Sequence, residues 1–168
     1  MNDSQNPAIA RFGKMTSGLA LALITTVTGA CMAMGNAFNL RLLKQESFEQ
    51  CPMPAAQDHH QVLNDSVAWQ SLLQKSTGMP AFKEWQPNFA KEKVLVFAMG
   101  SKRSGGFSVK FTEVKLDQAS LIVKVEQLSP TPGSMNTAVL TNPCVIGLVT
   151  SQGSHAVRFE DSKTGTKL

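Results

Sequence analysis

The residues whose types first point to chemistry are the adjacent histidines His59 and His60. Neighbouring residues on an extended strand point to opposite faces, so both rings could bind one metal ion only in an irregular loop. The sequence has no HExxH or CxxC spacing that would complete a zinc site. We therefore expect surface histidines, and we predict no metal site and no cofactor.

Ser104 is the candidate nucleophile, because Gly105-Gly106 follows it. A nucleophile elbow also needs glycine two residues before the serine, and Lys102 occupies that position. The two glycines precede a strand pattern, not a helix whose N-terminus would bind phosphate. Neither Cys51 nor Cys144 has a neighbour that would lower a thiol pKa. We therefore predict no catalytic residue and expect that the protein is not an enzyme.

Residues 94–111, VLVFAMGSKRSGGFSVKF, form the segment around which we expect the fold to be organised. Val94–Met99 is an apolar run of strand length, and residues 107–111 alternate between apolar and polar side chains. Glycine permits a sharp reversal between them. The pattern predicts a β-hairpin whose loop is a candidate binding site, since binding is often placed on loops of a rigid sheet. The candidate binding residues are Lys102, Arg103, Ser104, Gly105, Gly106 and Phe107.

The alternative is that this loop has only a structural role. In that interpretation Gly105-Gly106 only makes the turn, and Phe107 only fills the core.

The rest of the chain predicts one helix and several short strands. Asn64-Asp65-Ser66 offers N-cap chemistry, and Trp69, Leu72 and Leu73 form one apolar stripe, so a helix is expected over 67–75. Strand patterns occur at 39–48, 61–63, 121–126, 137–141, 144–149 and 156–159. These elements predict an α+β domain: a mainly antiparallel sheet of about five to seven short strands with the helix packed on it.

The N-terminus has the order of a secretory signal peptide. Arg11 and Lys14 precede the apolar run Leu19–Ile24, and small residues follow it. We expect a signal peptide over 1–30, possibly to 37, a single domain over 38–160 and a disordered tail over 161–168. The protein is expected to be exported to the periplasm.

Two processing sites compete in the export segment. Thr28–Cys31 resembles a bacterial lipobox, in which Cys31 would carry the lipid, whereas Gly35-Asn36-Ala37 suits ordinary signal peptidase. An uncleaved segment is a third possibility, because the uncharged stretch is long enough to span a bilayer of about 30 Å. Contact with a membrane is therefore expected only through a lipid on Cys31 or through an uncleaved signal segment.

The cysteines and the net charge bear on the compartment of the protein and on its class of partner. Cys51 and Cys144 are free to form a disulfide in an oxidising compartment, and two buried thiols are the alternative. The net charge is +4, but the basic residues are scattered rather than gathered in a stripe. Nucleic-acid binding is therefore not expected.

Several pieces of the sequence together resemble the C-terminal domain of the PrcB family, a protease complex subunit of bacterial cell envelopes. The resemblance covers about residues 62–150 and is carried by Val94–Gly100, Lys102–Val109, Pro130–Gly133 and Thr141–Pro143. This chain has Ser104 where the family tends to have threonine and Phe107 where it has tyrosine. Any contact made by the tyrosine hydroxyl would therefore be missing.

The resemblance implies an exported, often lipid-anchored accessory domain that associates with an envelope protease. It implies no catalytic residue and no cofactor. The partner would be an envelope protease or another envelope protein. The alternative function is a structural envelope lipoprotein without a discrete partner. A small-ligand carrier or a hydrolase is less favoured.

Overall fold

Seven strands and one helix make up the described part of the chain. In the computed structural model, the described residues are 40–53, 59–76, 82–151 and 153–168, so the predicted signal peptide, its two processing sites and Cys31 lie outside them. In chain order the elements are β1 (Leu42–Phe48), β2 (His59–Leu63), α1 (Ser66–Lys75), β3 (Glu92–Ala98), β4 (Ser108–Asp117), β5 (Ser120–Leu128), β6 (Cys144–Thr150) and β7 (Ala156–Asp161).

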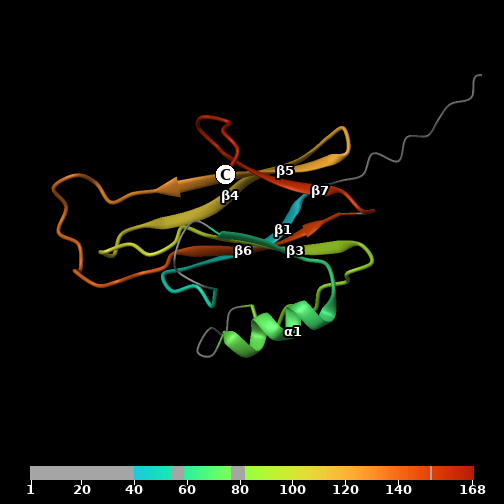
Figure 1. The fold of residues 1–168 in the computed structure, drawn as a ribbon, viewed down its shortest axis with the longest axis horizontal. Coiled ribbons are helices and arrows are strands. Elements are labelled where there is room, and N and C mark those ends of the chain that lie inside the picture. Colours follow the sequence, from blue (N-terminus) through green and yellow to red (C-terminus); the bar gives the residue numbers. More distant parts are fainter. Residues whose placement is uncertain (1–39, 54–58, 77–81, 152) are drawn as a thin grey trace, which may run out of the picture. The chain divides into compact units, whose positions relative to one another are not determined.

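The strands form two sheets, where we expected one. A four-stranded antiparallel sheet has the order β1-β6-β3-β2. A three-stranded sheet has the order β4-β5-β7, with β4 and β5 antiparallel and β5 and β7 parallel. Figure 1 shows α1 on one side of the four-stranded sheet and the other sheet on its opposite side. The fold is therefore mostly β with one short helix, although the strand number and the mainly antiparallel pairing match the prediction.

Strands β3 and β6 are buried on both faces. Val94 and Val96 of β3 belong to the core under α1, whereas Leu95 and Phe97 belong to the core between the sheets. In β6, Ile146 and Val145 divide in the same way. A strand covered on both faces needs no polar residues, which explains the continuous apolar run at residues 94–99.

Helix α1 covers the outer face of the four-stranded sheet, as predicted. The Asp65 side chain caps it by accepting from the Ala68 N–H at 2.8 Å. Trp69 packs among Phe82 and Trp85, with ring centroids 5.6 and 6.5 Å away. These aromatic side chains are buried and complete the outer core. No helix in the described residues has the length and apolar character that a membrane crossing requires.

The predicted β-hairpin at 94–111 is wrong. Strand β3 pairs with β2 and β6, while β4 pairs with β5 in the other sheet. Both edges of β3 are thus occupied, so the chain must leave this sheet after Ala98. Periodicity located both strands, but it carries no information about which strand lies beside which.

The two sheets are joined where the Phe111 ring lies against Gly147. A Cβ at Gly147 would be 2.7 Å from a carbon of that ring, so only glycine fits. At the same place Gln45 of β1 binds the backbone of Phe111: its Oε1 accepts from the N–H at 2.9 Å and its Nε2 donates to the C=O at 3.1 Å. The Ser47 hydroxyl donates to the Val109 C=O at 2.7 Å. Side chains of β1 therefore satisfy the free edge of β4 beside its bulge.

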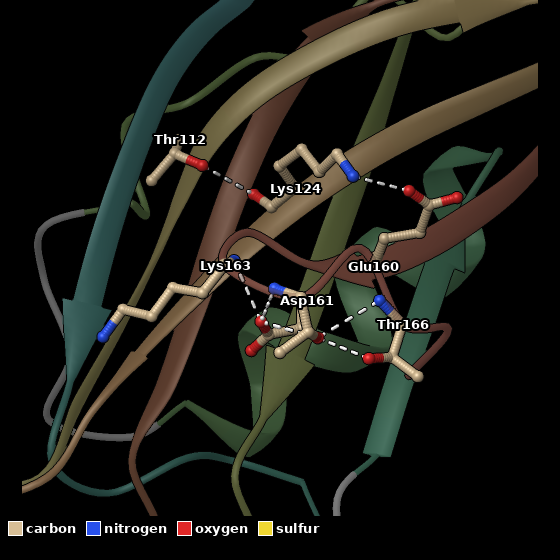
Figure 2. A network of polar contacts seen from close by, with 7 residues as sticks. Thr112, Lys124, Glu160, Asp161, Lys163 and Thr166 are labelled. Atoms are coloured by element: carbon tan, nitrogen blue, oxygen red, sulfur yellow. Dashed lines mark hydrogen bonds and ion pairs between the residues drawn. The ribbon is translucent and has the colours of Figure 1, made fainter.

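The tail over 161–168 is ordered, contrary to our expectation. Asp161 Oδ1 accepts from the backbone N–H groups of Lys163 and Thr164, and the Asp161 N–H donates to the Thr166 C=O at 2.8 Å (Figure 2). The backbone N–H groups of Thr164 and Lys163, which donate to the carboxylate, hold the pKa of Asp161 below its usual value. The chain then folds back, and Leu168 packs against the inter-sheet core. Polar composition made the segment resemble a disordered one, but a single carboxylate folds it locally.

An ion pair ties β5 to β7 beside this turn. Lys124 Nζ lies 2.7 Å from Glu160 Oε2, and both side chains are largely buried. The hydrogen bond from Lys124 lowers the pKa of Glu160 (Figure 2).

His60 of β2 contacts Phe159 of β7, which belongs to the other sheet. The His60 ring lies 4.9 Å from that of Phe159, which also contacts Phe97 and Phe111. Desolvation lowers the pKa of His60, and the nearby positive charges of His59 and Lys167 lower it further.

Replacement of Gln45 by methionine is expected to destabilise the protein by about 1–3 kcal/mol, because the buried N–H and C=O of Phe111 lose their partners. Urea denaturation would measure the change. Glu46→Met, at an exposed position of the same strand, is the control and should change stability by less than about 0.5 kcal/mol. Equal effects of the two substitutions would contradict this role of Gln45.

Stability is expected to fall as the pH falls from 7.5 to 5.5. The folded pKa of His60 lies below the unfolded value of about 6.5, so in this range the unfolded state binds more protons. Urea midpoints at the two pH values would measure the loss. His60→Phe should make the midpoint less dependent on pH, and His155→Asn serves as the control. A slope unchanged by His60→Phe would refute the assignment.

Candidate functional site

The predicted binding loop, Ser101–Phe107, packs along a second loop, Ser129–Asn142. Lys102 and Thr141 exchange two backbone hydrogen bonds of 2.8 and 2.9 Å. The Gly105 N–H donates to the Thr137 C=O at 2.9 Å, and the Thr141 hydroxyl donates to the Ser104 C=O at 3.0 Å. The two segments, here called the loop pair, therefore form one structure at the end of the domain where β3 and β5 end and β4 and β6 begin (Figure 1).

A side chain would be tolerated less well at Gly106 than at Gly105. Gly106 has φ +85°, and a Cβ there would lie 2.5 Å from Asn136 Oδ1 and 3.1 Å from Pro130 Cβ. At Gly105 the nearest atom to such a Cβ would be 3.9 Å away. The requirement for glycine in this loop therefore rests on Gly106, because of both its conformation and its neighbours.

The base of the loop pair is fixed by contacts with the segment that follows β1. Asn142 is buried, and its Nδ2 donates to the Met53 C=O at 3.1 Å. Its C=O accepts from the Cys51 N–H at 2.9 Å. Cys51 and Cys144 are joined by a disulfide, with their Cα atoms 5.4 Å apart. The end of β1 is thus tied to the start of β6, directly beneath the loops.

The predicted binding residues differ in how they meet the solvent. Arg103 and Gly106 are exposed, and Lys102, Ser104, Gly105 and Phe107 are half-buried. Lys102 Nζ lies 5.9 Å from the centre of the Phe107 ring, and that ring also packs against the inter-sheet core. Phe107 therefore serves partly as core, and Lys102 and Arg103 supply the charge.

Sequence reasoning missed the apolar residues of the second loop. It predicted a strand over 137–141, which would bury every second side chain, but the segment is irregular and exposed up to Leu140. Met135, Val139 and Leu140 are all exposed. The prolines and glycine at 130–133 were the available signal. They indicate an irregular segment, and Met135, Val139 and Leu140 follow them.

None of the three histidines belongs to the loop pair, although His59 lies beside Ala98 at the end of β3 that leads into it. His60 packs on Phe159, and His59 lines a small hollow of about 90 Å³ with Met53 and Lys75, whose described lining has no carboxylate. His155 lines a groove of about 380 Å³ with Val62 and Lys93. The described residues include no cluster of three or more histidine, cysteine or acidic side chains placed to hold a metal. The residues of the loop pair include Lys102 and Arg103 but no histidine, aspartate or glutamate.

Comparison with known families bears on this segment. A family model described as PrcB C-terminal matches residues 93–147. The resemblance seen in the sequence is thereby confirmed for the stretch that runs from β3, through the loop pair and the β4-β5 hairpin, into β6. No curated protein and no solved structure matches the chain.

Replacement of Gly106 by alanine is expected to cost about 1–3 kcal/mol, because a residue with a Cβ is strained at positive φ and would also collide with Asn136. Gly105→Ala is the matched control, expected within about 0.5 kcal/mol of the parent. Urea denaturation of both variants would decide. Equal losses would show that the contact between the loops does not depend on Gly106.

Proposed function

We propose that this protein is a non-catalytic accessory domain of the bacterial cell envelope that associates with a protease through the loop pair. The observation that carries the proposal is the match of the PrcB C-terminal family to residues 93–147, because this stretch contains the loop pair and the strands that fix it. A PrcB-like domain is a protease-associated domain, and it makes an envelope protease the first partner to test.

The architecture of the loop pair supports a binding role. Loops that bind a partner lose less entropy when they are already ordered, and here hydrogen bonds, Gly106 and the disulfide hold the two segments in place. The exposed Arg103 and the half-buried Lys102 supply charge at its surface.

A role without catalysis is supported by the chemistry of this surface. The Ser104 C=O accepts a hydrogen bond from the Thr141 hydroxyl. The described histidines lie elsewhere: His59 and His60 on β2, and His155 just before β7. The residues of the loop pair thus include no general base for a serine nucleophile.

Export to an oxidising compartment belongs to the same proposal. The signal-like segment at 1–30 provides the route, and the bond between Cys51 and Cys144 fits a periplasmic environment. Cys31 remains the candidate for lipid attachment and would hold the domain at the membrane surface.

Chemical crosslinking of intact cells, followed by immunoprecipitation with an antibody against the domain, tests the proposal. An antibody is preferable to a C-terminal tag, because Leu168 packs against the core. We expect mass spectrometry to find a protease enriched over a control exported protein of unrelated fold. The same preparation gives the mature N-terminus, expected at an acylated Cys31 or at Phe38. Absence of any enriched protease would refute the proposal and favour a structural lipoprotein.

A further inference from the structure

Exposed apolar side chains gather at one end of the domain. Of the six large hydrophobic residues exposed in the described part of the chain, four lie between positions 128 and 140. Val139 is 46% exposed, Leu140 is 65% exposed, and Met135 is fully exposed, with Leu128 at the start of the same connection. Single exposed hydrophobic residues are common, but a group of them on one connection marks a site of interaction.

The same end of the domain carries unpaired positive charge. Residues 99–107 and 128–143 contain Lys102 and Arg103 and no aspartate or glutamate. The ion pairs within the described residues are Lys110–Glu126 and Lys124–Glu160, so neither of these two cations takes part in one.

The backbone register brings the charge and the apolar surface together. Lys102 and Thr141 form an antiparallel bridge, and Arg103, which follows the first, and Leu140, which precedes the second, are the next residues on the two loops. Both side chains are exposed. The Leu140 C=O is itself held by Gln50 Nε2 at 2.9 Å, so this part of the surface has a fixed shape.

We propose that Leu128, Met135, Val139 and Leu140, with Lys102 and Arg103 at their rim, form a docking surface for a segment of a partner protein in which apolar side chains are flanked by carboxylates. The proposal rests on the proposed function and adds the surface and the chemistry of the partner. Apolar contact supplies the buried area, and the unpaired cations select an acidic rim.

The charges argue against two other occupants. A second copy of the same surface would set two cations against two cations, which is unfavourable. Membrane surfaces are recognised by clusters of about four to eight basic residues, and this surface has two.

Photo-crosslinking in intact cells tests the docking surface. The full chain would carry a photo-reactive amino acid at position 140 or, as the control, at position 67, because Val67 is also an exposed hydrophobic residue and lies on α1. We expect a protein adduct at position 140 but not at 67, and the crosslinked peptide should contain apolar residues beside aspartate or glutamate.

Charge reversal gives the second arm of the experiment. Lys102→Glu with Arg103→Glu should reduce the adduct at position 140 at least about fivefold. Lys44→Glu with Lys91→Glu, at exposed positions elsewhere, should leave it unchanged. Thermal melting curves of all variants would show that each is folded.

The outcomes separate the two proposals. A protease captured by chemical crosslinking, without an adduct at position 140 or with one that ignores charge reversal, would overturn the docking surface and leave the proposed function standing. Adducts at position 140 with lipid, or with a second copy of this chain, would overturn it as well. If chemical crosslinking captures no protease, the proposed function fails independently of the adduct at position 140.

Discussion

The burial of β3 and β6 on both faces is the constraint from which the rest of the structure follows. Each strand presents apolar side chains in both directions, so one cover is not enough. Helix α1 with Phe82 and Trp85 provides one cover, and the three-stranded sheet provides the other. A domain with a single sheet and one helix, as expected from the sequence, would leave Leu95 and Phe97 in water.

The same constraint creates the surface at the loop end. Since β2 and β6 occupy both edges of β3, the chain must cross to the second sheet after Ala98, and it must return from β5 to β6 at the same end. Both crossings are irregular, and they contact each other through Lys102 and Thr141. The strand order thus places the β3–β4 and β5–β6 connections side by side. Because both are irregular, neither has a face that must be buried in a sheet.

Local features of the fold were predictable from the sequence, and long-range features were not. The N-cap at Asp65, the helix after it and the strand positions depend on neighbours a few residues away, which a single sequence displays. Strand partners depend on long-range packing, such as that of the Phe111 ring against Gly147, which neither residue shows alone. At the candidate site the charged loop was predicted, but the apolar loop was missed, because a strand was expected at 137–141 and a strand would bury half of its side chains.

Gln45 has a consequence for the behaviour of the protein at high concentration. With one amide side chain it fills the hydrogen-bonding positions on Phe111 that a neighbouring strand would use. A free strand edge is a template for edge-to-edge aggregation. By closing the β4 edge at its bulge, Gln45 removes one route by which concentrated domains would pair strand to strand and aggregate.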